Sequence, residues 1–99
     1  MSQESSVESR TVRVLITGRV QGVAYRIWTE RTAKAMGLSG WVRNRRDGAV
    51  EALFSGAPSQ VNEMLGRCRE GPPAAWVLQV TVIGEGGAAP SGFKVLPTA

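Results

Sequence analysis

The sequence predicts an α+β fold, a split βαβ sandwich in which two helices cover one face of an antiparallel sheet. Three observations lead to this prediction: the expected elements follow in the order β-α-β-β-α-β, the expected strands are rich in β-branched residues, and an Asp-Gly step marks a hairpin turn in mid-chain. A chain of 99 residues suits one domain with one core. We expect that domain over residues 11–99, after a flexible polar tail over residues 1–10.

The first strand is expected over residues 11–17, where every second residue from Val12 to Ile16 is apolar and β-branched. The first helix is expected from Tyr25 to Met36, because the sequence there is helix-forming and stops at Gly37, a good C-terminal cap. The flank of this helix that faces the core is expected to carry Thr29, Ala33 and Met36.

Two short strands are expected over residues 40–44 and 48–55, joined by a turn that contains Asp47-Gly48. In the second of them, three residues should point into the core: Val50, Ala52 and Phe54. The turn and the alternation together predict a hairpin at the centre of the chain.

A second helix is expected to begin near Pro58, because four apolar residues follow the spacing i, i+3, i+4, i+7: Val61, Met64, Leu65 and Cys68. A strand over residues 76–83 follows, and residues 93–96 could add a short fifth strand. The three tryptophans, Trp28, Trp41 and Trp76, are interpreted as packing residues.

The composition favours an anionic partner and excludes several kinds of catalytic site. Arginine and lysine outnumber aspartate and glutamate by 12 to 8, and ten of these cations are arginine, which suits bidentate contacts with phosphate or carboxylate. A basic surface that serves only solubility is an equally good interpretation of the charge alone. The chain has no histidine and one cysteine, Cys68, which excludes His-ligated zinc, histidine-activated nucleophiles and an internal disulfide.

We therefore expect neither a metal ion nor another cofactor. No apolar run approaches the ~20 residues of a membrane span, so we expect a cytoplasmic protein without a membrane partner. We also expect a monomer.

The segment Gly18–Arg26, GRVQGVAYR, joins the first strand to the first helix. A glycine-rich turn at a helix N-terminus exposes main-chain N–H groups, and arginine adds a forked cation, so this junction predicts an anion site. Arg26 is placed to clamp two phosphoryl oxygens, while Arg19 on the rim would steer. Two alternatives stay open: the glycines only let the chain turn, or Arg26 pairs with an acid or a chain terminus.

Two segments of the sequence resemble the acylphosphatase family. Residues 16–26, ITGRVQGVAYR, resemble its first signature. Residues 40–44, GWVRN, followed by Gly48, Val50 and Gly56 at the family's spacing, resemble its second. The resemblance runs from about Thr11 to Leu96 and implies a ferredoxin-like fold, the same sandwich that the order of elements predicts.

The resemblance also implies residue roles and an activity. It makes Arg26 the phosphate-binding arginine and Asn44 the residue that orients the attacking water. It assigns the phosphate-binding loop to Arg19, Val20, Gln21, Gly22, Val23, Ala24 and Tyr25, with Tyr25 standing where phenylalanine is more usual. Considered alone, Asn44 is typical of a turn residue that bonds the local backbone. The implied enzyme is a hydrolase of small-molecule acyl phosphates.

This activity is compatible with a chain that lacks histidine. The leaving group is a carboxylate whose parent acid has a pKa of ~4, so it departs without a general acid. Phosphoryl transfer passes through a loose transition state, and a neutral amide can then hold the water without acting as a base. Phosphate monoesters, with their more basic leaving groups, would fit this chain poorly.

Two other functions compete with the hydrolase. The first is a noncatalytic domain that binds phosphate or carbamoyl phosphate, as in larger hydrogenase-maturation proteins. The second is an RNA-binding module, which the fold and a pI near 10.2 invite. RNA binding needs outward aromatic residues, whereas the outward positions of the first and third strands hold Thr11, Arg13, Leu15, Thr17, Ala49, Glu51, Leu53 and Ser55. We therefore expect no nucleic-acid partner.

Overall fold

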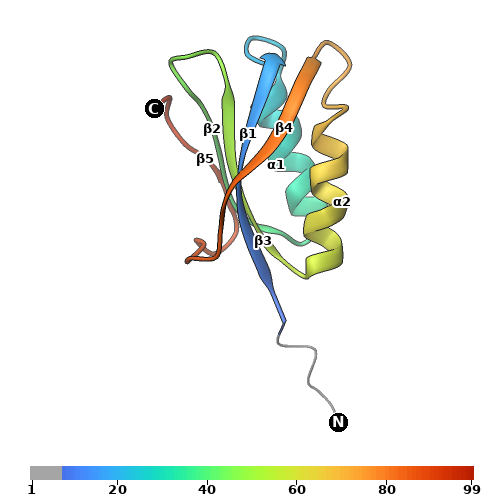
Figure 1. Ribbon diagram of the computed structural model, residues 1–99, viewed down its shortest axis with the longest axis vertical. Coiled ribbons are helices and arrows are strands. Elements are labelled where there is room, and N and C mark those ends of the chain that lie inside the picture. Colours follow the sequence, from blue (N-terminus) through green and yellow to red (C-terminus); the bar gives the residue numbers. More distant parts are fainter. Residues whose placement is uncertain (1–7) are drawn as a thin grey trace.

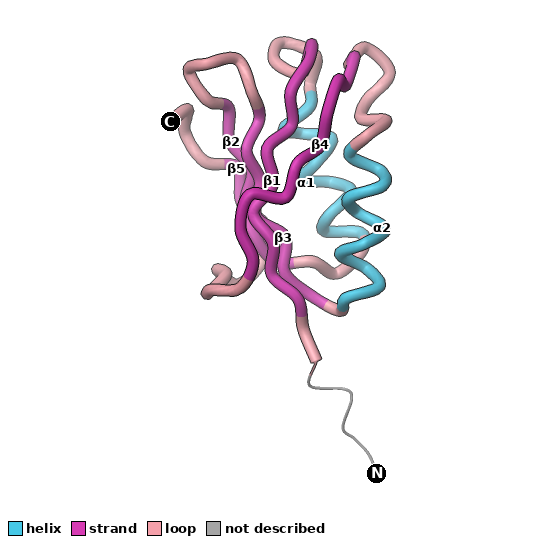
Figure 2. Tube along the Cα trace, viewed as in Figure 1, coloured by secondary structure: helices cyan, strands magenta, loops and turns pink. Residues whose placement is uncertain are grey.

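Two helices pack against one face of a five-stranded sheet, with strand order β4-β1-β3-β2-β5 (Figure 1). The computed structural model describes residues 8–99. The strands are β1 (Arg10–Arg19), β2 (Ser39–Asn44), β3 (Val50–Gly56), β4 (Trp76–Glu85) and β5 (Phe93–Val95), and the helices are α1 (Tyr25–Ala35) and α2 (Pro58–Cys68). The expected α+β fold, with both helices on one face of the sheet, is confirmed (Figure 2).

The core lies between the sheet and the helices. Strand β1 supplies three fully buried β-branched residues, Val12, Val14 and Ile16, because its alternation turns one face toward the helices. Strand β3 contributes Val50, Ala52 and Phe54, as expected, and α2 contributes Val61, Met64 and Cys68. The buried stripe of α1 is Tyr25, Thr29 and Ala33, so the side chain of Tyr25 is part of the core.

The sheet is antiparallel from β4 through β1 and β3 to β2. The short fifth strand is present and pairs parallel to β2, which makes the complete sheet mixed. Strand β1 begins at Arg10, and the part of the expected tail from 1 to 7 lies outside the described residues. Within the described chain, no helix combines the length and hydropathy that a membrane crossing requires.

Some details differ from the expectations. Strand β3 starts at Val50 because Gly48, with φ of 96°, belongs to the preceding turn. The interpretation of Trp76 as a packing residue is wrong, since its side chain is 71% exposed. Trp76 begins β4, an edge strand, so one flank of this residue has no neighbouring strand to cover it.

Candidate active site

The β1–α1 loop and the β2–β3 turn lie at the same end of the sheet, at the top of Figure 1. The loop ends at Ala24, the N-cap of α1, which has the left-handed conformation with φ of 66°. A non-glycine residue in this region is uncommon and carries strain, a feature that often accompanies binding sites.

The first turn of α1 presents free hydrogen-bond donors. The first main-chain bond of the helix joins the N–H group of Trp28 to the carbonyl of Ala24 at 3.0 Å, and Ala24 provides no side-chain cap. Within residues 8–99, the N–H groups of Tyr25, Arg26 and Ile27 therefore have no main-chain acceptor. Donors of this kind, together with the helix dipole, favour an anion.

The two glycines of the loop have different functions. A Cβ atom at Gly18, where φ is 123°, would lie 2.2 Å from the carbonyl oxygen of Trp76, so this glycine allows β1 to approach β4. A Cβ atom at Gly22 would meet nothing within 4 Å, and its φ of 74° is the reason for glycine there. Gly22 lines the candidate site, whereas glycine is required at position 18 because β1 packs closely against β4 there.

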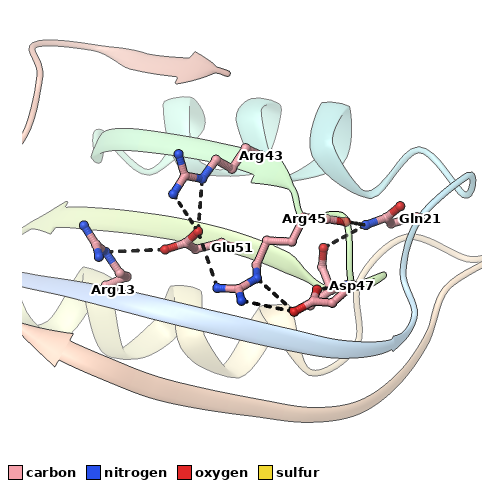
Figure 3. Close-up of polar contacts among 7 residues, drawn as sticks. Arg13, Gln21, Arg43, Arg45, Asp47 and Glu51 are labelled. Atoms are coloured by element: carbon pink, nitrogen blue, oxygen red, sulfur yellow. Dashed lines mark hydrogen bonds and ion pairs between the residues drawn. The ribbon is translucent and has the colours of Figure 1, made fainter. Parts of the chain in front are cut away.

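Gln21 joins the loop to the β2–β3 turn. Its side-chain amide donates to the carbonyl oxygen of Arg45 at 2.7 Å and to that of Ala49 at 2.9 Å (Figure 3). These two residues flank the turn that follows Asn44. The amide thus spans from the helix side of the site to the strand side.

A cavity of about 220 Å³ brings the two expected catalytic residues together. Arg26 lies in the first turn of α1, and Asn44 is the last residue of β2. The cavity is lined by Val20, Gly22, Ala24, Tyr25, Arg26, Ile27, Asn44 and Val95.

Arg26 is available to a ligand. Its side chain is half-buried and forms no ion pair with any residue from 8 to 99, so the pairing with an acid that the sequence left open is not found there. A guanidinium group at a helix N-terminus, facing a cavity, suits an oxyanion.

Asn44 carries an unsatisfied acceptor. Its Oδ1 atom is buried and accepts no hydrogen bond from the described part of the chain, so this oxygen does not bond the local backbone as that of a turn residue would. The main chain of Asn44 is instead held on both flanks, by pairing with Val50 in β3 and by the N–H group of Ala99, 3.0 Å from its carbonyl oxygen. A buried carbonyl oxygen without a donor costs about 1–3 kcal/mol, which a ligand or water that donates to it would offset.

The other residues expected in the phosphate-binding loop do not all face the cavity. Val20, Gly22, Ala24 and Tyr25 line the cavity. Val23 packs against the core, and Arg19 is exposed beside another hollow, formed with Trp76 and residues 73–75. The Tyr25 hydroxyl points away from solvent and donates to the carbonyl of Cys68 at 2.6 Å, and burial raises the pKa of this tyrosine.

Two cavity-lining residues were not expected from the sequence. Ile27 follows Arg26 in the first turn of α1, and this position next to an expected site residue is the one feature of the sequence that points to it. Val95 lies on β5, whose pairing with β2 depends on a long-range contact that no local pattern indicates.

A charged cluster supports the strand that carries Asn44. Glu51, 3% exposed, lies on the outer face of the sheet, with guanidinium nitrogens of Arg43 at 2.9 Å, Arg13 at 3.5 Å and Arg45 at 3.9 Å (Figure 3). Arg43 also stacks over the ring of Trp41, 4.8 Å from its centroid. Arg43 and Arg45 flank Asn44 in the chain, so this network holds the main chain on both sides of it.

The turn after Asn44 is also fixed by its own acid. Asp47 accepts from the N–H group of Ala49 at 3.0 Å and pairs with Arg45 at 3.1 Å. These contacts, the backbone hydrogen bond first, lower the pKa of the Asp47 carboxyl. From residue 8 to the end of the chain, no group of three or more His, Cys, Asp or Glu side chains could hold a metal ion.

Known proteins resemble this chain over nearly its whole length. The family model described as Acylphosphatase matches residues 12–95. An acylphosphatase of Bradyrhizobium diazoefficiens is 54% identical over 93 residues, which cover 88% of this chain and 94% of that protein. An acylphosphatase of Rhodospirillum rubrum is also 54% identical over 93 residues, covering 90% and 98%. A solved structure of an acylphosphatase from Coxiella burnetii has a TM-score of 0.82 and 31% identity, and covers 97% of this chain and 100% of its own.

Proposed function

We propose that this chain, which belongs to the acylphosphatase family, is an enzyme that hydrolyses the carboxyl-phosphate bond of acyl phosphates to a carboxylate and inorganic phosphate. The observation that supports this most directly is the cavity shared by Arg26, the first turn of α1 and the unsatisfied Oδ1 atom of Asn44. One side of the cavity offers donors for a phosphoryl group, and the other offers an acceptor for a water O–H.

In the proposed reaction, the phosphoryl group lies over the N-terminus of α1. The free N–H groups of the first turn and the loop bind its oxygens, and Arg26 clamps two of them through its guanidinium fork. These donors stabilise the charge on the equatorial oxygens of a loose transition state. The loop acts through its main chain, because the side chains of Gln21, Val23 and Tyr25 are engaged elsewhere.

Asn44 orients the water in this proposal. Its Oδ1 atom accepts a hydrogen bond from the water, whose oxygen lone pair then faces phosphorus in line with the departing carboxylate. The amide is neutral and takes no proton. Because a carboxylate leaves without protonation, neither a general acid nor a nucleophilic side chain is required.

The competing function is a noncatalytic phosphate-binding domain. It would use the same donors but would have no need for an unsatisfied acceptor opposite them. The buried Oδ1 atom of Asn44 therefore favours hydrolysis over binding alone.

A comparison of substrates tests the function. The purified chain is mixed with benzoyl phosphate in the presence of EDTA, and the loss of ultraviolet absorbance is followed, with p-nitrophenyl phosphate as the monoester control. We expect rapid hydrolysis of benzoyl phosphate that EDTA does not slow. Monoester hydrolysis should be at least about 100-fold slower, because its leaving group is more basic than a carboxylate and the proposed site has no general acid to protonate it. Phosphate binding without turnover of benzoyl phosphate would identify a binding domain instead.

We further propose that the enzyme works as a cytoplasmic monomer. Cys68 is a free, buried thiol, which is compatible with a reducing compartment. Size-exclusion chromatography with light scattering would test the oligomeric state.

A further inference from the structure

The cavity that Arg26 and Asn44 line also has an apolar wall, and the proposed phosphoryl transfer assigns no role to this wall. Ile27, on α1, lines this cavity beside the two polar residues. Ile27 is 46% exposed, so much of its side-chain surface is not buried in the protein core. An exposed apolar side chain next to a reacting group can instead pack against the substrate.

The direction of attack determines which wall the acyl group meets. In-line displacement requires the attacking water and the departing acyl oxygen on opposite sides of phosphorus. Asn44, which would hold the water, lies on the sheet at the end of β2, whereas Ile27 lies on the helix that covers the sheet. The acyl group therefore points toward the helix wall of the cavity.

The charges that line the cavity limit the acyl groups that fit. Among the described residues that line the cavity, Arg26 is the one cation, and the proposed reaction uses it to bind the phosphoryl group. A second carboxylate on the acyl group would find no further cation in the cavity and would lose hydration against Ile27.

We propose that Ile27 forms an acyl-group subsite that selects acyl phosphates with apolar acyl groups, aromatic ones above acetyl. This proposal rests on the proposed hydrolase function, since it concerns the part of the same substrate that the phosphate-binding residues do not touch. Its chemistry is the burial of apolar acyl surface against the side chain of Ile27.

The test compares two substrates in the variant Ile27→Ala. Benzoyl phosphate carries a ring that can pack on Ile27, while acetyl phosphate carries one methyl group. Truncation of a half-exposed side chain should lower the ratio of kcat/KM for benzoyl over acetyl phosphate about three- to tenfold, at the low end of what apolar pockets discriminate. The inhibition constant of inorganic phosphate should change less than about twofold, because phosphate has no acyl group.

The chain offers a matched control. Ile83 is also 46% exposed, lies on β4 and does not line the cavity. Ile83→Ala removes the same atoms from an equally exposed position and should leave the ratio unchanged. Ile27→Leu, which keeps the apolar volume, should preserve the wild-type ratio.

The outcomes separate this inference from the proposed function. An unchanged ratio in Ile27→Ala, with both substrates still hydrolysed by wild type, overturns the subsite and leaves the hydrolase intact. An equal loss for both substrates also overturns it, since Ile27 would then serve helix structure alone. If wild type hydrolyses neither substrate but still binds inorganic phosphate, the proposed function has failed, and the subsite fails with it.

Discussion

The side-chain amide of Gln21 lies 2.7 Å from the carbonyl oxygen of Arg45, and this hydrogen bond ties the β1–α1 loop to the residue that follows Asn44. A second bond from the same nitrogen reaches Ala49 at 2.9 Å. One amide thus fixes the distance between the donors that would hold the phosphoryl group and the residue that would hold the water.

Gln21→Glu should therefore lower kcat by about tenfold or more, because a misplacement of about 1 Å between reacting groups can cost as much as 100-fold. The glutamate keeps the size of the side chain but turns an oxygen toward two carbonyl oxygens. Steady-state kinetics with benzoyl phosphate and urea unfolding are measured together. Gln21→Asn is measured for comparison, because asparagine keeps the amide donor on a side chain that is shorter by one methylene group. A kcat at the wild-type level in Gln21→Glu would show that the tether has no part in positioning.

Arg26→Ala should reduce turnover by about 1,000-fold or more, the amount that an arginine contributes to a phosphoryl transition state. The half-buried guanidinium has no ion pair within the described chain, so its removal should leave the unfolding free energy nearly unchanged. Arg26→Lys keeps the charge without the fork and should recover little of the loss. Near-wild-type hydrolysis by a folded Arg26→Ala protein would refute this role.

Asn44→Ala should abolish most of kcat with a modest change in KM, because the phosphoryl group is bound elsewhere. The substitution also removes the buried Oδ1 atom that has no donor in the described chain, so the folded state should lose little stability. Turnover, KM and the inhibition constant of phosphate are measured in parallel. If phosphate affinity falls as much as kcat, Asn44 is a binding residue and the water is oriented by another group.

The buried pair Tyr25 and Cys68 should make the fold sensitive to alkali. Burial raises the pKa of the Tyr25 hydroxyl, and it raises the pKa of the Cys68 thiol to about 12. The unfolded chain releases these protons at lower pH than the folded one. The contribution of each group is therefore fully present below its unfolded pKa, about 9 for Cys68 and about 10 for Tyr25, and falls above that pH by about 1.4 kcal/mol per pH unit.

Urea unfolding at pH 8, 9, 10 and 11 measures this loss. Tyr25→Phe keeps the ring but removes one of the two groups, so its stability should decline less steeply above pH 10. At pH 8 this variant should be about 1 kcal/mol less stable than wild type, because it lacks the hydrogen bond to the Cys68 carbonyl. Equal slopes for wild type and Tyr25→Phe above pH 10 would contradict a buried, protonated Tyr25.

Local patterns in the sequence account for most of the fold. The alternation of Val12, Val14 and Ile16 and the helical spacing of Val61, Met64 and Cys68 each reflect one face turned to the core, and all six residues are buried. The parallel pairing of β5 with β2 depends on contacts between distant segments, which three residues of strand cannot encode locally. The exposure of Trp76 depends on β4 being an edge strand, a property of the whole sheet.

The sequence predicts part of the candidate site. Gly22 and Arg26 stand out because the chain must turn and present a cation at a helix N-terminus, and Asn44 was implied by the family resemblance. The engagement of Gln21 with Arg45 and Ala49 could not be predicted, because it requires the distance between two loops. The same holds for Tyr25, whose hydroxyl reaches the end of the other helix.

The attachment of Asn44 on both flanks has a consequence for the rate of the reaction. Ala99 donates to its carbonyl from one side, and β3 holds it from the other, while Gln21 keeps the opposing loop in place. A site whose halves are already joined has little to order when a small molecule enters. We therefore expect that no slow closing step limits turnover. On that basis, kcat at saturating substrate should be insensitive to the viscosity of the solvent.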